Sequence, residues 1–200
     1  MTQQALIVGI TGGIGSGKST VARYLRANNC KVYDSDKAAK HIQNTNAVVR
    51  AKTVELFGEE AYNDGGMNRQ FVAQRAFEDK DMLRKLSEIV HPAVKSDFLN
   101  WIKSNQNEDI LFVESAILYE SGFNTLVNKV LLVSARIETR ICRVMRRDKT
   151  SRENVIQRIE NQMNEETLKE KADIIIYTDD DIPMNVKIFV LLKKLREQIN

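Results

Sequence analysis

The sequence predicts an α/β fold, with a parallel sheet of about five strands and helices on both faces. Short apolar runs rich in β-branched residues recur along the chain, and helix-like stretches alternate with them. The runs cover residues 5–10, 31–33, 110–113, 130–133 and 174–177. Strands that alternate with helices pair in parallel, because a parallel connection needs a crossover that is usually a helix.

The individual elements follow from their local patterns. The run at 5–10 stops at glycines, as expected of a buried strand, and Val21, Ala22 and Leu25 give a helix over 18–28 its apolar stripe. The strand at 31–33 ends at Asp34. A last helix over 184–199, rich in Leu, Val and Lys, is expected to pack its apolar stripe on the sheet.

The long gap between the second and third strands, residues 37–109, shows helical patterns and no convincing strand. Asn63-Asp64-Gly65-Gly66 is predicted to be a turn within it. We therefore expect a single domain over 1–200, with a core of 1–36, 108–135 and 168–200 and a helical insertion over 37–107.

Composition excludes several classes of protein. The 200 residues are 42% apolar with a net charge of +3, enough for one core and too balanced for an acidic or basic tail. No run of 18 apolar residues suggests a membrane span, and the first residues lack a secretion signal. Two cysteines, Cys30 and Cys142, are too few for a disulfide framework. These features predict a cytoplasmic protein that does not enter a membrane.

A glycine-rich stretch fits the phosphate-binding pattern G-x-x-x-x-G-K-[ST] from Gly12 to Ser19. It follows a predicted strand and opens a predicted helix, so backbone N–H groups and the helix N-terminus would face a nucleotide's phosphates. The pattern assigns Lys18 to the β- and γ-phosphates and the Ser19 hydroxyl to Mg²⁺. We name this stretch the cradle, and the residues expected to bind ATP in it are Gly13, Gly15, Ser16, Gly17, Lys18, Ser19 and Thr20. The alternative is a glycine-rich turn with an exposed lysine.

Other P-loop classes fit poorly. No glycine lies three residues beyond an aspartate after the cradle, and Asn128-Lys129-Val130-Leu131 lacks the final acid of the guanine-binding N-K-x-D pattern. A switch GTPase is therefore not expected.

Two carboxylates follow the second strand, in Asp34-Ser35-Asp36. In a doubly wound sheet ligands bind at the carboxyl ends of strands, so one of these acids could take the proton of an acceptor hydroxyl. Helix capping is the alternative, since Asp and Ser are favoured N-caps. For Asp34 and Ser35 the residues alone leave both open.

A basic cluster spans residues 136–152, with seven Lys and Arg against two acids. Arg140, Arg143 and Arg147 recur at spacings of three and four, so they share a helix face suited to triphosphate oxygens. We expect a lid over 136–167 that closes on the nucleotide and excludes water. A solvated basic face or a nucleic-acid patch is the alternative.

Together these motifs resemble the dephospho-coenzyme A kinase family along most of the chain. The resemblance lies in residues 10–22, in Val32-Tyr33-Asp34-Ser35-Asp36, in 56–58, 67–69, 76–77 and 89–94 of the helical insertion, and in Arg143, Met145, 147–148, 151–153, Gln162 and 172–173. Ala116 departs from it, standing where the family has proline, and Thr178-Asp179-Asp180-Asp181 replaces an asparagine-containing turn.

The resemblance implies a reaction and its participants. It implies phosphorylation of the 3′-hydroxyl of dephospho-coenzyme A by ATP with Mg²⁺, without nucleic acid, by a monomer or weak homo-oligomer. It assigns Asp36 as base, Lys18 and Arg143 to the transferring group, and Arg147 to the nucleotide. It makes 37–107 the acceptor-binding region, and the acceptor residues it implies are Asp34, Asp36, His91 and Glu120.

Purely structural roles for some of these residues, and two other functions, stay open. His91, before Pro92, also suits a structural role at a helix break, and Trp101 with Phe98 suits a core. One rival is a nucleoside or nucleoside-monophosphate kinase of the same fold. The other is a nucleotide-gated protein that binds nucleic acid through its arginines.

Overall fold

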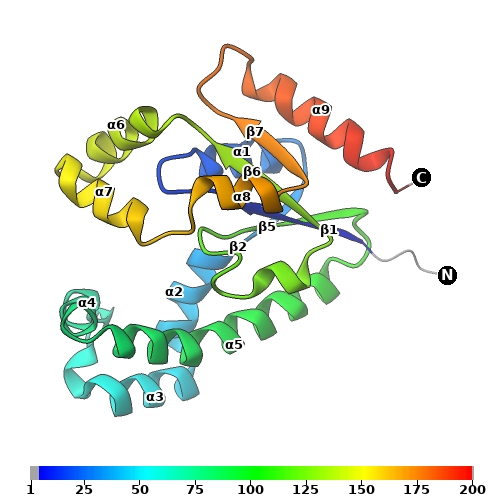
Figure 1. The fold of residues 1–200 in the computed structure, drawn as a ribbon. Coiled ribbons are helices and arrows are strands. Elements are labelled where there is room, and N and C mark those ends of the chain that lie inside the picture. The colour runs from blue at the N-terminus through cyan, green and yellow to red at the C-terminus, as the bar shows by residue number, and fades with distance from the viewer. Residues whose placement is uncertain (1–4, 200) are drawn as a thin grey trace. The chain divides into compact units, whose positions relative to one another are not determined.

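The computed structural model describes residues 5–199, except the side chains of residues 77, 78 and 80 (Figure 1). The ends of the predicted domain and the Phe77 side chain of one family motif therefore lie outside the described residues. The chain divides into two compact units. The first consists of Met1–Asp34 and Ser104–Asn200, and the second is Ser35–Lys103.

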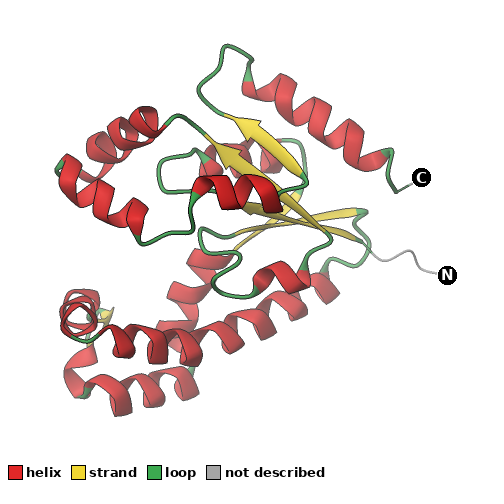
Figure 2. Cartoon of the chain, viewed as in Figure 1, coloured by secondary structure: helices red, strands yellow, loops and turns green. Residues whose placement is uncertain are grey.

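The first unit contains a five-stranded parallel sheet, which confirms the predicted fold class (Figure 2). Its strands are β2 (Lys31–Asp34), β5 (Ile110–Glu114), β1 (Leu6–Thr11), β6 (Lys129–Ser134) and β7 (Ile174–Tyr177), in that spatial order. Glu114 lies in register with Ile10 of β1 and with Asp34 of β2. The carboxyl ends of these three strands therefore meet at one edge of the sheet.

Two helices cover one face of this sheet. In α1 (Lys18–Ala27) Val21 and Leu25 are buried, and α9 (Met184–Arg196) buries an apolar stripe that includes Leu191 and Leu192. Both helices share one core cluster with Val8, Ile10, Phe112, Leu131 and Val133 of the strands. The predicted packing of the last helix is confirmed. On the other face α8 (Glu165–Lys171) contacts β6 (Figure 1).

The segment between β6 and α8 forms two further helices, α6 (Ile137–Asp148) and α7 (Arg152–Glu160). The Ser151 side chain caps α7 by accepting a hydrogen bond from Asn154 N at 3.3 Å. Ile141, Val144 and Val155 form a small core between the two helices, and Ile14 of the cradle packs against it. The helices thus have their own apolar attachment to the cradle.

The connection before β6 differs from the expectation that a helix precedes each later strand. Residues 116–122 are turns, followed by a single 3₁₀ turn at Phe123–Leu126. Gly122, at φ +69°, precedes that turn in a conformation that ends regular structure.

The second unit is helical, with one small addition. It holds α2 (Ser35–Thr45), α3 (Ala47–Phe57), a 3₁₀ turn (Glu59–Ala61), α4 (Arg69–Glu78) and α5 (Lys80–Ser104), whose last residue belongs to the first unit. The predicted turn at 63–66 lies between two antiparallel strands, β3 (Tyr62–Asn63) and β4 (Gly66–Met67). No strand was expected here, because two residues per strand are too few to show a period of two.

The helix α5 runs through Pro92, so the helix break expected beside His91 is wrong. A proline removes one backbone hydrogen bond, which a 25-residue helix with further buried turns tolerates. Phe98 and Trp101 of α5 stack with ring centroids 6.0 Å apart, and Phe98 is fully buried, as the core interpretation predicted. Between residues 5 and 199 no helix combines the length and apolar character needed to cross a membrane.

Candidate active site

The cradle links the end of β1 to the start of α1, at the edge of the sheet where β1, β2 and β5 end. Gly12, Gly15 and Gly17 adopt φ values of +146°, +79° and +97°, which glycine reaches without strain. Gly17 is the N-cap residue of α1 and accepts from Thr20 N and Val21 N. The loop therefore leads directly into a helix N-terminus, where backbone N–H groups lack partners within the helix.

The polar groups of the cradle are unevenly satisfied. Lys18 Nζ donates to Gly12 O at 2.5 Å and to Gly13 O at 3.2 Å, so the ammonium group lies along the loop. Ser16 Oγ is fully buried and has no hydrogen-bond partner among the described residues. The Ser19 side chain is exposed at the start of α1. A buried hydroxyl without a partner is costly, and an entering oxygen-rich ligand would satisfy it.

Arg143 joins the cradle to the turn that follows β7. Its Nη1 donates to Thr178 Oγ1 at 2.7 Å and to Gly15 O at 3.3 Å, and its Nη2 donates to Thr178 O at 2.9 Å. Thr178 Oγ1 in turn donates to Ser16 O at 2.7 Å. Thr178, the first residue of the turn that departs from the expected asparagine-containing pattern, thus contacts the cradle directly.

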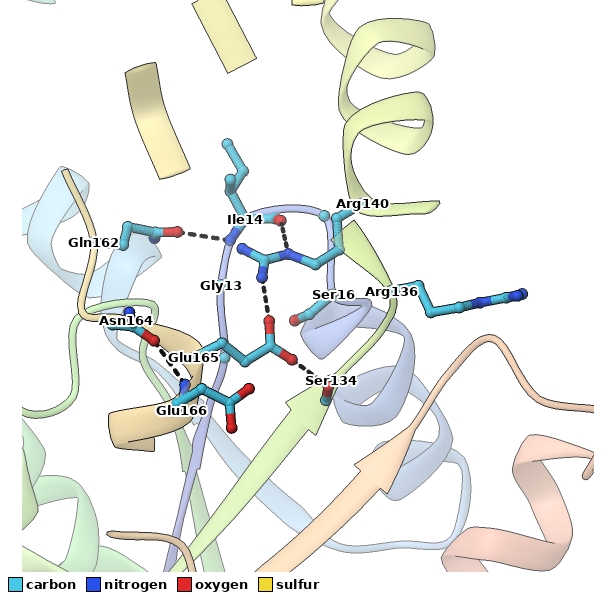
Figure 3. Close-up of polar contacts among 12 residues, drawn as sticks. Gly13, Ile14, Ser16, Ser134, Arg136, Arg140, Gln162, Asn164, Glu165 and Glu166 are labelled. Atoms are coloured by element: carbon cyan, nitrogen blue, oxygen red, sulfur yellow. Dashed lines mark hydrogen bonds and ion pairs between the residues drawn. The ribbon is translucent and has the colours of Figure 1, made fainter. Parts of the chain in front are cut away.

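Arg140 does not fit the expected arginine face. It is 3% exposed, its Nε donates to Ile14 O at 3.0 Å, and its Nη1 forms an ion pair with Glu165 (Figure 3). Glu165 also accepts from Ser134 Oγ. Buried charges are paired in proteins, and these contacts engage the Arg140 guanidinium within the protein.

Most other cations of residues 136–152 are also paired. Arg147 and Arg158 both contact the Asp148 carboxylate at 2.7 Å, and these guanidinium groups hold the pKa of Asp148 below its usual value. The other pairs are Arg136 with Asp179 and Arg152 with Glu138. Two of the pairing acids, Asp179 and Glu165, lie outside the segment, which is why a count within it overestimated the free charge. An open groove of about 1010 Å³ runs along α6 beside Arg143 and Arg147.

Three carboxylates occupy the strand ends or follow them. Asp34 closes β2, and Asp36 lies two residues on, in the first turn of α2 in the second unit. Glu114 closes β5 opposite Asp34, and Ser115 N donates to Ile10 O at 3.0 Å. Sequence reasoning did not select Glu114. An apolar run that ends in an acid was visible, but only the strand order shows that this run neighbours the strand before the cradle.

The remaining predicted acceptor residues lie in different units. Glu120, in the turns after β5, accepts from Met163 N at 3.2 Å, in the segment between α7 and α8. His91 is half-buried in α5, and burial, with a smaller effect of Lys95, lowers its pKa below its usual value. Among the described side chains of residues 5–199, no three of His, Cys, Asp or Glu lie together in a way that could hold a metal ion.

The fold and the site define a P-loop protein of the kinase type, in which a glycine cradle ends at a helix and a basic helical segment covers it. The family model described as Dephospho-CoA kinase matches residues 6–183. A dephospho-CoA kinase of Bacteroides fragilis is 38% identical over 98% of this chain and 96% of its own length. That of Porphyromonas gingivalis is 42% identical over 82% and 80%. The solved dephospho-CoA kinase of Campylobacter jejuni has a TM-score of 0.71 at 25% identity, over 96% of this chain and 98% of its own.

The chain therefore belongs to the dephospho-CoA kinase family, and it is a transferase. The resemblance seen in its motifs is confirmed, as is the predicted class of enzyme.

Proposed function

We propose that the protein transfers the γ-phosphoryl group of ATP to the 3′-hydroxyl of dephospho-coenzyme A, giving coenzyme A and ADP. The family match over nearly the whole chain supports the acceptor. The observation that carries the ATP side is the cradle, where the Ser16 hydroxyl is buried without a partner among the described residues and the Lys18 ammonium lies along the loop. A triphosphate supplies the oxygens that both groups require.

The cradle binds the β- and γ-phosphates in this proposal. Backbone N–H groups of Gly15, Gly17 and Ser19 and the positive end of α1 face the phosphates, and Lys18 leaves the Gly12 and Gly13 carbonyls to contact them. Fixed donors of this kind stabilise the charge that develops on the transferring group without reorganisation. Arg143 contributes from its position against Gly15, and Arg147 contacts the nucleotide from the groove along α6.

Magnesium fits the oxygen donors at this edge. The Ser19 hydroxyl is exposed at the start of α1 and Glu114 closes the neighbouring strand, and Mg²⁺ keeps several waters beside few protein ligands. Ser19 would hold the ion directly, with Glu114 orienting its water shell. When bound, the ion supplies neutralisation of phosphate charge.

The acceptor side relies on the second unit, which overlaps the predicted insertion 37–107. Asp36 accepts the proton of the 3′-hydroxyl while the hydroxyl oxygen bonds to the γ-phosphorus and the bond to the β–γ bridging oxygen breaks. The family match supports Asp34, His91 and Glu120 as further acceptor residues. Residues 136–167 act as the lid that keeps water from competing as acceptor.

The acceptor is tested by incubating the purified protein with MgATP and each of a panel of alcohols and measuring the release of ADP. Dephospho-coenzyme A is expected to give the highest kcat/KM, and preference for a nucleoside or a nucleoside monophosphate would refute the proposal in favour of that class of kinase. We further propose that the protein is cytoplasmic, since Cys30 and Cys142 are free thiols, as in a reducing compartment. We also propose that it is a monomer or a weak homo-oligomer.

Two variants test the roles. Asp36→Asn removes the base but keeps the side-chain volume, so kcat is expected to fall at least about 100-fold while the Kd for ATP changes little. Lys18→Ala removes a phosphate contact, so both ATP affinity and kcat are expected to fall. Wild-type kcat in Asp36→Asn would remove this residue as the base.

A further inference from the structure

We propose that Gln162, Arg140 and Glu165 form a clamp on the backbone of Ile14, and that this Ile14 clamp presets the cradle for ATP. The inference rests on the proposed function for the identity of the nucleotide. It assigns these three side chains as positioning residues, which act on ATP through the loop rather than by touching it.

Ile14, in the first half of the cradle, is attached at three points. Its N–H donates to Gln162 Oε1 at 2.8 Å, and its carbonyl accepts from Arg140 Nε at 3.0 Å (Figure 3). Its side chain packs against the small core between α6 and α7. Hydrogen bonds and apolar contacts from residues 137–162 therefore fix the position of this one residue.

The clamp is itself anchored to the sheet. Arg140 is 3% exposed and paired with Glu165, which lies in the first turn of α8. The same Glu165 carboxylate accepts from Ser134 Oγ at the end of β6. The Ile14 carbonyl is thus connected through three side-chain interactions to the strand beside β1, so a shift of this carbonyl would disturb the Arg140–Glu165 ion pair.

Such an anchor matters because the loop is intrinsically flexible. Ile14 lies between Gly13 and Gly15, and glycine loses more conformational freedom on ordering than any other residue. A loop ordered before ATP arrives does not pay that cost on binding, which raises affinity. The clamp restricts the conformation of the loop at a position where the flanking glycines leave it flexible.

The clamp also uses one of the hydrogen-bond donors of the cradle. The Ile14 N–H is already bonded by Gln162, so it is not available to a phosphate oxygen. Ser16 Oγ, two residues later, is buried and without a partner among the described residues. The Ile14 N–H is therefore used within the protein, whereas the Ser16 hydroxyl is left for the phosphates.

A positioning role predicts a specific kinetic pattern. If the variant cradle is competent only part of the time, the apparent Kd for ATP rises by the inverse of that fraction, while the bound complex turns over normally. KM for ATP then rises with kcat unchanged. Direct contact of Gln162 or Arg140 with the transferring phosphoryl group would instead lower kcat.

The test uses the full chain with Gln162→Met, which keeps the length of the side chain but removes the strong acceptor. Gln157→Met, on the exposed face of α7, is the matched control, and Gln162→Glu retains an acceptor oxygen. Steady-state kcat and KM for ATP are measured, together with MgATP binding by calorimetry and the thermal midpoint of each variant.

We expect the KM and Kd for ATP of Gln162→Met to rise roughly tenfold, with kcat within about twofold of the wild type, since the loss of one hydrogen bond costs about one decade in an equilibrium constant. Gln162→Glu is expected to restore affinity to within about threefold, and Gln157→Met to match the wild type. Should Gln162→Met fail to fold, Glu165→Gln carries the test, with the same rise in KM expected.

Equal ATP affinity in Gln162→Met and the wild type would overturn the clamp and leave the proposed function intact. A fall in kcat at unchanged KM would overturn the positioning role in favour of direct phosphate contact. Failure of the wild type itself to bind MgATP would overturn the proposed function, and the clamp with it.

Discussion

Replacing Gly13 with alanine tests how closely α6 approaches the cradle. A Cβ at this position would lie 1.9 Å from Arg140 Nη2 and 2.5 Å from its Cζ, closer than atoms can approach. The backbone at Gly13 is not in the left-handed region, so alanine brings no conformational strain of its own. Any loss of stability in Gly13→Ala therefore comes from displacing the guanidinium group.

The size of that loss follows from what the guanidinium contacts. Displacement breaks the hydrogen bond to Ile14 O and weakens the ion pair with Glu165, whose side chain is 25% exposed against 4% for Arg140. Removing one partner of a buried pair costs about 3–5 kcal/mol, and here the charge is moved rather than removed, so we expect about 2–3 kcal/mol. For a chain of this length the thermal midpoint should fall by roughly 5–10 °C.

The assay is a double-mutant cycle with Arg140→Ala, followed by thermal unfolding. In the Arg140→Ala background the added methyl group meets no guanidinium, so the cost of Gly13→Ala is expected to disappear. Gly65→Ala serves as a control, since its Cβ would meet only Asn63 Oδ1 at 3.3 Å on an exposed turn. An equal fall in both backgrounds, or no fall in either, would refute the reasoning.

Three further predictions concern pH, capping and thiol chemistry. Burial lowers the pKa of His91 below its unfolded value near 6.5, so the unfolded state binds the proton more readily, and stability should fall as pH decreases from 6.5 toward the folded-state pKa. Thermal midpoints measured between pH 7.5 and 5.5 should therefore depend less on pH in His91→Asn than in the wild type. An equal dependence of the midpoint on pH in both proteins would contradict this. Asp179 accepts hydrogen bonds from the backbone N of Arg136, just before α6, at 2.8 Å and from the Nε of Arg136 at 2.9 Å. Asp179→Ala should therefore cost roughly 1 kcal/mol of stability and lower the thermal midpoint by about 2–4 °C. A midpoint equal to that of the wild type would show that the pair contributes nothing. Burial raises the pKa of the half-buried Cys30 thiol while Cys142 is exposed, so iodoacetamide should modify Cys142 at least about ten times faster by mass spectrometry, and faster labelling of Cys30 would be inconsistent with the fold.

The strands could be predicted from the sequence because each is an uninterrupted apolar run, and all five lie within one or two residues of their expected bounds. The order of the strands could not be predicted this way. β5 pairs with β1 across more than 100 residues, and only that pairing brings Glu114 beside the strand that leads into the cradle. A residue whose importance depends on its neighbour in the sheet has no local signal.

The arginines show a second limit of sequence reasoning. Spacing correctly places Arg140 and Arg143 on α6, where both contact the cradle. Spacing does not reveal that Glu165, 25 residues away, pairs with Arg140 and buries it. Helix periodicity gives the direction in which a side chain points, whereas its ionic partner depends on tertiary packing.

Glycine is required in the cradle for two separate physical reasons, and the phosphate-binding pattern accounts for only one of them. The pattern requires glycine at Gly12 and Gly17, and leaves the positions of Gly13 and Gly15 open. At Gly15 a Cβ would lie 2.5 Å from the backbone carbonyl of Arg140, which cannot move away as a side chain can, and the φ of +79° adds strain. Gly15→Ala should therefore be more damaging than Gly13→Ala. The approach of α6 explains both extra glycines, so in this chain packing against α6 constrains the sequence of the cradle in addition to the phosphate-binding pattern.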